Sequence, residues 1–287
     1  MTDQHFRHTL TIAQTALFSP GDRPDRVRKS LAGDADLVIA DLEDAVAADA
    51  KAQARVNVVD IVEDEAAFPD RPGMVVRISE PHSPAGEADL AALAGLSDPA
   101  RARLAVMIAK TQSPHDVAAV FAQLGEDVPV IALIESARGV LNAVEIAEHA
   151  SVVRLALGGI DLAADLGCDV DSATTAHARA QLVLASASTG LAGPIASPCP
   201  NFRDPEVVAD AARSARSNGL SGILCIHPAQ LDPATQAFAP SEEDVAWARK
   251  VVDAADGATA LDGQMIDRPV ILKAQAVLAA VGQTERH

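Results

Sequence analysis

Short apolar runs rich in β-branched residues recur along the chain, and segments with apolar positions three and four residues apart separate them. This alternation is typical of parallel β-strands joined by crossover helices, because strands buried on both faces are continuously apolar. Eight runs are present, and this number favours closure into a barrel over an open, doubly wound sheet. The expected strands lie within residues 16–22, 35–44, 73–80, 102–110, 128–135, 152–161, 193–198 and 222–228.

The segments between the runs are rich in alanine and have the spacing of amphipathic helices. Asp204 stands before Pro205, which is the arrangement of an N-cap followed by proline in the first helical turn. Gly190 and Gly219 stand where a helix commonly ends in a left-handed residue. The predicted fold class is therefore α/β, with the architecture of a (β/α)8 TIM barrel. The expected helices include residues 45–65, 137–150, 172–190 and 204–219.

The C-terminal residues exceed those that a minimal barrel needs. We expect a TIM-barrel catalytic domain over residues 1–256 and a C-terminal lid extension over residues 257–287. Within the extension, LDGQMIDRP indicates a loop or short hairpin, and VILKAQAVLAAVG indicates a helix. The extension could cap its own barrel or reach that of a neighbouring subunit.

Charge and composition exclude several classes of partner. The 287-residue chain has 23 Lys and Arg against 40 Asp and Glu, a net charge of −17. This charge repels nucleic-acid phosphates and anionic membrane surfaces, so we expect neither as a partner, and an anionic substrate needs a local basic patch. The N-terminus indicates no secretion signal, and no apolar stretch reaches the ~18 residues of a membrane span. The three cysteines lack the spacing of a disulfide framework or zinc site, so we expect a cytoplasmic location.

Acidic residues gather where the runs end, and catalytic side chains of such barrels lie at the C-terminal strand ends. Glu135 and Asp161 end the fifth and sixth runs, so their carboxylates would converge in a closed barrel. Magnesium is usually held by one or two carboxylates plus substrate oxygens, and Gly158 and Gly159 leave room for it. The alternatives are that Glu135 only pairs with Arg138 and that Asp161 only caps the following helix.

Three carboxylates, those of Asp41, Glu43 and Asp44, crowd the end of the second run. Alternation along a strand would turn Glu43 to the side opposite its neighbours. We expect at least one of them to accept hydrogen bonds from metal-bound water or to hold an arginine. Asp44 is equally suited to cap the helix that follows.

Three basic side chains also stand at strand ends. The planar fork of Arg77 suits a substrate carboxylate, or alternatively a structural ion pair with one of the acidic residues of the second run. Lys110 has the same two interpretations. His227 could transfer protons, but a histidine before proline more often forms a hydrogen bond with the backbone, which is the interpretation we prefer.

Ordered motifs through nearly the whole chain resemble one known family. They are LFSPGDRPDRVRKSL, DLEDAV, ALIESARGVLNAVEIA, LGGIDLAADLG, FRDPE, IHPAQ and DGQMIDRP. In this order they resemble the HpcH/HpaI aldolase and citrate lyase group, within it the citrate lyase β-subunit-like and malyl-CoA or citramalyl-CoA lyase branch. The resemblance implies a barrel enzyme, commonly a homotrimer, that binds Mg2+ and cleaves or condenses 3-hydroxyacyl-CoA thioesters.

The resemblance also implies roles for single residues. Glu135 and Asp161 match the metal ligands, and Arg77 matches the residue that binds the carboxylate of the 2-oxo acid. Asp267 resembles a carboxylate that a C-terminal lid delivers to the neighbouring subunit's active site, although the residues alone indicate a turn before Arg268. Residues that match the contacts of coenzyme A are Phe18, Arg23 and Lys29, and the candidate catalytic residues are Arg77, Asp267, Glu43 and Asp44.

The resemblance, together with these residues, implies a magnesium-dependent lyase for a citryl-, malyl- or citramalyl-CoA type of thioester, with an acyl-CoA and a 2-oxo acid as its other substrates or products. Magnesium would polarise the carbonyl of the oxo acid, Arg77 would orient the acid, and Asp267 would be the base. The alternatives are a citrate lyase β subunit acting on an acyl-carrier thioester and an aldolase acting on free hydroxy acids. Two positions depart from the family pattern: Ser79 replaces a frequent Asn, and Ala109-Lys110-Thr111-Gln112 replaces Pro-Lys-x-Glu.

Overall fold

The computed structural model describes residues 4–68, 70–254, 260–261 and 264–284. The chain divides into two compact units, Met1–Ala234 and Thr235–His287. The domain boundary expected between residues 256 and 257 lies outside the described residues. The two units are considered separately below.

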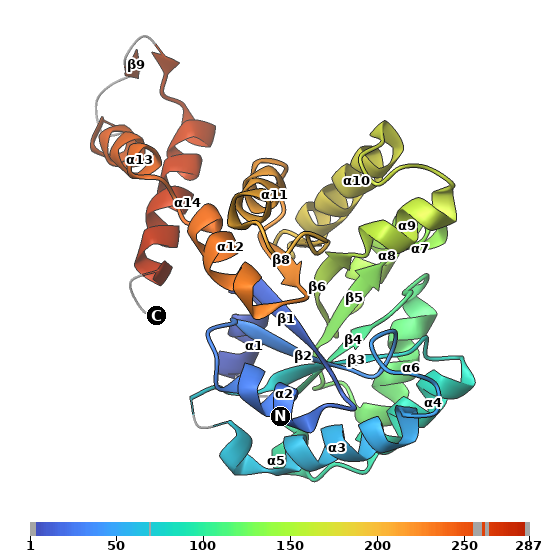
Figure 1. Ribbon diagram of the computed structural model, residues 1–287. Helices are drawn as coiled ribbons and strands as arrows, with labels where there is room; N and C mark the ends of the chain where they lie inside the picture. Colours follow the sequence, from blue (N-terminus) through green and yellow to red (C-terminus); the bar gives the residue numbers. More distant parts are fainter. Residues whose placement is uncertain (1–3, 69, 255–259, 262–263, 285–287) are drawn as a thin grey trace. The chain divides into compact units, whose positions relative to one another are not determined.

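Eight parallel strands close into a barrel, because β1 (Thr15–Pro20) pairs with both β2 (Leu37–Asp41) and β8 (Gly222–Cys225) (Figure 1). The expected α/β class and TIM-barrel architecture are confirmed, and each of the eight expected runs overlaps one strand of the barrel. The other strands follow in chain order: β3 (Met74–Ile78), β4 (Leu104–Ile108), β5 (Val130–Ile134), β6 (Val152–Leu157) and β7 (Ile195–Ala196).

Helices connect the strands and bury their apolar sides against them. Asp204 accepts a hydrogen bond from the Glu206 N–H, and Gly190 and Gly219 have φ of 76° and 88°, so the predicted helix ends are confirmed. The helices are α2 (Pro24–Leu31), α3 (Lys51–Glu63), η1 (Glu65–Ala67), α4 (Pro84–Ala94), α5 (Asp98–Arg101), α6 (Pro114–Leu124), α7 (Ala137–Leu141), α8 (Ala143–Ala147), α9 (Gly159–Leu166), α10 (Ala173–Thr189), α11 (Pro205–Ser217), η2 (Pro228–Gln230) and α12 (Leu231–Phe238).

Two expected helices differ from the structure. The helix expected from residue 45 begins at Lys51, because the Asp41 carboxylate accepts the Glu43 and Ala45 N–H groups and bends the backbone into turns. The helix expected over residues 137–150 is interrupted at Asn142, which separates α7 from α8.

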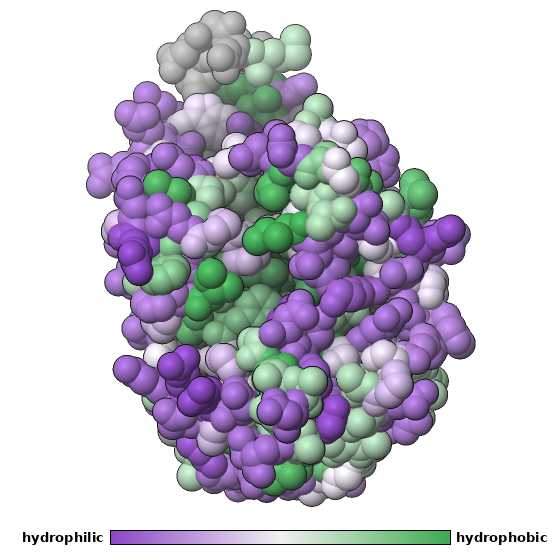
Figure 2. Space-filling model, turned by 45° about the vertical axis from the view of Figure 1, so that its right-hand side comes forward, coloured by the Kyte–Doolittle hydropathy of each residue, from purple (hydrophilic) through white to green (hydrophobic). Residues whose placement is uncertain are grey.

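The barrel interior is filled mainly with aliphatic side chains. An additional helix, α1 (Gln4–Ile12), adds Phe6 and Leu10 to this core, and both are fully buried. The apolar pattern did not predict α1, since the helix carries few apolar positions among charged and polar ones. Figure 2 shows that hydrophilic side chains cover much of one face of the molecule.

A fully buried arginine fastens α1 to the barrel. Arg154 of β6 donates to the carbonyl oxygens of Leu10 (3.2 Å), Ala13 (2.7 Å) and Gly193 (3.0 Å). It also donates to the Ser221 hydroxyl at 2.9 Å. Burial lowers its pKa to about 10, and its hydrogen bonds replace the water that burial removes. Arg154 thus links three segments of the chain, namely those that precede β1, β7 and β8.

The second unit contains α13 (Glu242–Ala254) and α14 (Arg268–Thr284), which pack against each other around Ala248, Val251 and Ala274. The strand β9 (Ala260–Leu261) pairs antiparallel with β10 (Gln264–Met265), in keeping with the short hairpin expected there. None of the helices in the described parts of the chain combines the length and apolarity needed to cross a membrane.

Candidate active site

A network of buried charges joins the carboxyl ends of β2 and β3. Arg77 lies beside Asp41 in the parallel register, and its Nε and Nη2 donate to the two Asp41 oxygens at 2.7 and 2.6 Å. Its Nη1 lies 3.1 Å from Glu43 Oε2, and the guanidinium stands over the Phe18 ring at 4.7 Å from the centroid. Burial lowers the pKa of Arg77, but the hydrogen bonds and charge of Asp41, with Glu43, raise it above its ordinary value.

The loop after β2 corrects two expectations. Strand β2 ends at Asp41, so the alternation of side chains along a strand does not apply to Glu43. The carboxylates of Asp41 and Glu43 both contact Arg77. Asp44 does not cap the next helix, because α3 begins later with Ala50 as its N-cap. The Asp44 side chain is 62% exposed and lies 4.0 Å from Lys110 Nζ.

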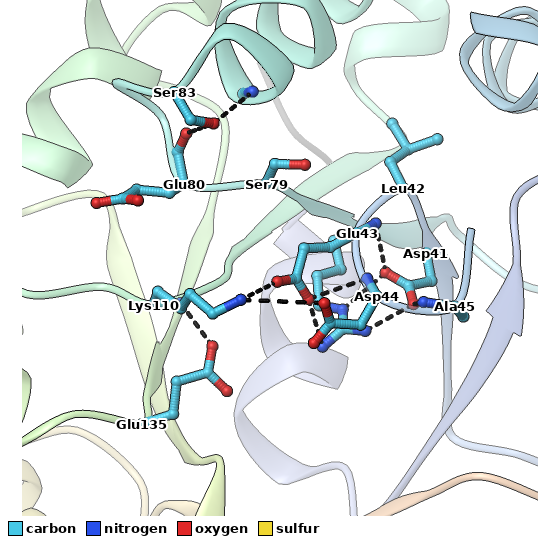
Figure 3. Close-up of polar contacts among 12 residues, drawn as sticks. Asp41, Leu42, Glu43, Asp44, Ala45, Ser79, Glu80, Ser83, Lys110 and Glu135 are labelled. Atoms are coloured by element: carbon cyan, nitrogen blue, oxygen red, sulfur yellow. Dashed lines mark hydrogen bonds and ion pairs between the residues drawn. The ribbon is translucent and has the colours of Figure 1, made fainter. Parts of the chain in front are cut away.

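Lys110, two residues after β4, contacts two carboxylates. Its Nζ donates to Glu43 Oε1, and its backbone N–H donates to Glu135 Oε1 at 2.7 Å (Figure 3). Among the described residues other than glycine, it alone has a positive φ, of 51°. Burial lowers the pKa of Lys110, but its hydrogen bond to Glu43 raises it above the ordinary value, so the side chain is an ammonium at neutral pH.

Glu135 directly follows β5 and is only 5% exposed. Burial raises the pKa of Glu135 to about 7, and the charges of Asp161 and Glu43 also act to raise it. The hydrogen bond from the Lys110 N–H acts to lower this pKa. Its hydrogen bond is with Lys110 rather than with Arg138, so the alternative ion pair is not formed. A Cβ on Gly158 would lie 2.3 Å from Glu135 Oε2, so this glycine leaves room for the Glu135 carboxylate, and the room that we expected for magnesium stays a prediction.

Asp161 lies four residues beyond β6, in the first turn of α9, and not at a strand end as expected. Gly158 is the N-cap of α9, so Asp161 is not the capping residue of our alternative interpretation either. Its carboxylate is exposed, and its charge is close enough to raise the pKa of Glu135. The charge of Asp161 therefore acts on Glu135, and the role of the two residues as metal ligands stays a prediction.

The residues predicted to contact coenzyme A fall into two places. Phe18 is partly buried inside the barrel, beneath Arg77. Arg23 precedes α2 with a side chain that is 61% exposed and lies 3.6 Å from Asp22, and Lys29 is exposed on α2. These two cations supply positive charge beside the β1 strand end, and all three contacts stay predictions.

Asp267 lies in the second unit, directly before α14. Its Oδ1 accepts the Val270 N–H at 3.2 Å, which is the interaction of an N-cap, and the residue is exposed. Its delivery to a neighbouring subunit stays a prediction. His227 accepts the Ala229 N–H at its Nδ1, as our preferred interpretation has it, and its ring stacks on Phe202.

Three supporting residues were not predicted from the sequence. Lys51 Nζ donates to the backbone carbonyls of Leu42 (2.7 Å) and Glu43 (2.9 Å), which holds the loop after β2. The fully buried Asp89 accepts the Ser79 N–H and the Arg55 Nε, both within 2.9 Å. In the sequence these residues look like solvated helix positions, because the helical pattern does not show which loop they reach.

The electrostatics of the site suit one divalent cation. Arg77 and Lys110 make their short ion pairs with Asp41 and Glu43 and not with Glu135. The buried Glu135 carboxyl is therefore costly to ionise, and a cation would stabilise its ionised form. No group of three or more His, Cys, Asp or Glu within the described ranges could hold a metal. Two carboxylates completed by substrate and water oxygens fit magnesium, whereas a structural zinc site needs four protein ligands.

Comparison with known proteins identifies the family. A sequence model described as HpcH/HpaI aldolase/citrate lyase matches residues 14–228. A citrate lyase subunit beta-like protein from Deinococcus radiodurans is 35% identical, over 93% of this chain and 97% of that protein. A (3S)-malyl-CoA thioesterase from Cereibacter sphaeroides is 33% identical, over 95% of each chain.

A solved structure extends the likeness to the fold. The crystal structure of CitE from Mycobacterium tuberculosis, in complex with magnesium, acetoacetate and coenzyme A, superposes with a TM-score of 0.81 at 35% identity. The match covers 94% of this chain and 98% of CitE.

Proposed function

Because the chain belongs to the HpcH/HpaI aldolase/citrate lyase family, we propose that it is a magnesium-dependent carbon–carbon lyase acting on a 3-hydroxyacyl-CoA thioester of the citryl, malyl or citramalyl type. The products of cleavage are acetyl-CoA or a related acyl-CoA and a 2-oxo acid. One observation carries the proposal: the buried Glu135 and the nearby Asp161 offer two carboxylates while the short ion pairs of Arg77 and Lys110 are made elsewhere. The CitE complex with magnesium, acetoacetate and coenzyme A supports it.

Glu135 and Asp161 would hold the cation. When bound, magnesium supplies Lewis-acid polarisation of the carbonyl of the 2-oxo acid. Arg77 has five N–H groups, of which three face Asp41 and Glu43, so two remain for the carboxylate of the acid. The Phe18 ring beneath the guanidinium limits its movement, which fixes the orientation of the acid.

Asp267 of a neighbouring subunit would transfer the proton. In condensation it would remove a proton from the carbon next to the thioester. That carbon would bond to the carbonyl carbon of the oxo acid as the C=O π bond breaks, and the former carbonyl oxygen would take up a proton from water. Cleavage reverses these steps, with Asp267 returning the proton to the acyl-CoA. This part of the proposal requires an oligomer, for which we propose a homotrimer, and we place the enzyme in the cytoplasm.

The exposed Arg23 and Lys29 support free coenzyme A as the carrier, because they place two cations at α2 in a chain whose net charge is −17. A citrate lyase β subunit that acts on an acyl-carrier thioester would need partner chains for activity. An aldolase of free hydroxy acids would not respond to Arg23→Ala or Lys29→Ala. The kinship with a (3S)-malyl-CoA thioesterase favours a test for a following thioester hydrolysis.

The decisive experiment is a screen of malyl-, citramalyl- and citryl-CoA for cleavage with magnesium present. We expect at least one thioester to be cleaved, and we expect Glu135→Ala and Asp161→Ala each to abolish cleavage and magnesium binding. Glu145→Ala, at an exposed position of α8, is the control that should retain both. Full activity of both site variants would rule out the proposed metal site, and no cleavage of any thioester would rule out the substrate class.

A further inference from the structure

We propose that Lys110 is a positioning residue that sets both carboxylates of the site, Glu135 through its backbone N–H and Glu43 through its ammonium group. The inference rests on the proposed function, since it explains how that site is held in place. It assigns Lys110 no contact with the reacting atoms.

The backbone half of the proposal concerns Glu135. The Lys110 N–H lies 2.7 Å from Glu135 Oε1, and the other oxygen, Oε2, lies against Gly158, where a Cβ would come within 2.3 Å. The hydrogen bond thus fixes Oε1, and Oε2 occupies space that is free because Gly158 has no side chain. A metal ligand held in this way cannot rotate its two oxygens past each other without losing a hydrogen bond or meeting the α9 backbone.

The side-chain half concerns Glu43. Lys110 Nζ contacts Glu43 Oε1, while Arg77 Nη1 lies 3.1 Å from Oε2 of the same carboxylate. Arg77 belongs to β3 and Lys110 follows the neighbouring strand β4, and the two cations contact opposite oxygens of one buried carboxylate. Glu43 is therefore held between two cations and kept beside Arg77.

One residue reaches both carboxylates because of its backbone conformation. The φ angle fixes the direction of a side chain relative to the N–H of the same residue, and Lys110 has a φ of 51°, which L-residues other than Asn and Asp rarely adopt. In Figure 3 the N–H of Lys110 points to Glu135 and its side chain extends towards Glu43. A strained conformation at a functional site persists only where its surroundings hold it, and here both carboxylates do so.

Two pairs of variants separate the backbone from the side chain. Lys110→Gly and Lys110→Asn tolerate the left-handed conformation, whereas Lys110→Val and Lys110→Thr resist it, and all four lack the ammonium. Magnesium binding is measured by calorimetry in the full-length protein, with circular dichroism to verify folding. We expect the Gly and Asn variants to stay within about threefold of the wild-type Kd, and the Val and Thr variants to bind at least about tenfold more weakly.

Equal binding by all four variants, or equal loss in all four, would overturn the backbone role. Should the β-branched variants not fold, loss of binding in the Gly and Asn variants still overturns it and retained binding supports it. Wild-type protein that binds no magnesium would instead refute the proposed metal site, which keeps the two failures distinct.

The ammonium is tested by Lys110→Met and Lys110→Arg in the cleavage assay and in the reverse condensation. Met has a similar length without charge, so we expect a KM for the 2-oxo acid raised about tenfold with an unchanged magnesium Kd, because Arg77 loses its companion on Glu43. The Arg variant restores the KM. An unchanged KM in the Met variant contradicts the role of the ammonium.

Discussion

At the scale of single residues, Glu135 links the environment of one carboxyl group to the pH at which the site can bind a cation. The group is buried behind β5, next to the charge of Asp161, and its pKa is raised to about 7. A proton and a divalent cation compete for the same oxygens, because a ligand carboxylate must be deprotonated. The pH below which the site loses affinity for a cation is therefore set by the surroundings of Glu135 and not by the ordinary pKa of a glutamate.

This competition predicts a pH-dependent magnesium affinity. Below the pKa of about 7 the Glu135 carboxyl is protonated, and the apparent affinity should fall about tenfold for each pH unit. Above that pH the affinity should level off. Calorimetric titrations between pH 5.5 and pH 8.5 measure the profile, with both pH limits chosen about 1.5 units from the expected midpoint. Glu135→Gln is the control, whose weak binding should not change with pH, and a flat wild-type profile would contradict the prediction.

Gly158 gives a second prediction at this scale. In Gly158→Ala the new Cβ would lie 2.3 Å from Glu135 Oε2 and 2.6 Å from its Cβ, so the carboxylate must move. We expect magnesium to bind at least about tenfold more weakly, as measured by calorimetry, with native secondary structure by circular dichroism. Gly33→Ala is a matched control, because a Cβ there would meet its nearest atom at 3.4 Å. Equal affinities in the two variants would show that Glu135 adapts freely.

At the scale of elements, the loop between β2 and α3 decides which way the acidic residues face. Asp41 ends its strand, bends the following backbone with its own carboxylate, and turns Glu43 towards Arg77. Lys51, the first residue of α3, then fixes two carbonyl groups of the loop. The positions of the carboxylates thus depend on a helix that contributes no side chain to the proposed chemistry.

Removal of this support should lower both activity and stability. In Lys51→Met, two charge-assisted hydrogen bonds to the loop are lost, so we expect kcat/KM to fall about tenfold while the free energy of unfolding falls by about 1–3 kcal/mol. Cleavage kinetics and urea unfolding measure the two effects. Lys250→Met, at an exposed position of α13, should change neither. An unchanged kcat/KM in the Lys51 variant would show that the loop holds its shape without the ammonium.

The elements also show how far the sequence alone reaches. The strand and helix periods predict the eight-stranded barrel, and the strand ends predict Glu135, Arg77 and the acidic residues after β2. The sequence could not show that Arg77 pairs with Asp41, because either a substrate or a carboxylate satisfies a guanidinium. Nor could it predict the left-handed backbone of Lys110 or the placement of Asp161 within α9, since long-range contacts fix both.

At the scale of the whole barrel, closure depends on residues far from the catalytic end. Strand β7 has two residues and meets β6 at one register position, Ala156 with Ile195. The guanidinium of Arg154 bridges this region, because it bonds to Gly193 before β7 and to Ser221 before β8. A side chain therefore joins strands that share few backbone hydrogen bonds.

Arg154→Met should consequently destabilise the barrel. The substitution leaves the carbonyl groups of Leu10 and Ala13 without the Arg154 donor, while Gly193 keeps only the hydrogen bond from the Ser221 hydroxyl, and we expect a loss of about 3–5 kcal/mol in the free energy of unfolding. Urea unfolding followed by circular dichroism measures the change. Arg249→Met, at an exposed position of α13, is the control for loss of charge. A change below about 1 kcal/mol would mean that the carbonyl groups find other donors.

The brevity of β7 has a consequence for how the barrel opens. A closed ring of strands separates first between the strands that pair over the fewest positions, and here those strands are β6 and the two-residue β7. Under native conditions, amide protons on both sides of β7 should exchange with deuterium through a local opening, well before those of β3 and β4, which pair over five positions. This local opening lies between β6, which leads into α9, and β7, which precedes α11. It would therefore loosen Asp161 while leaving Arg77 and its partners in place.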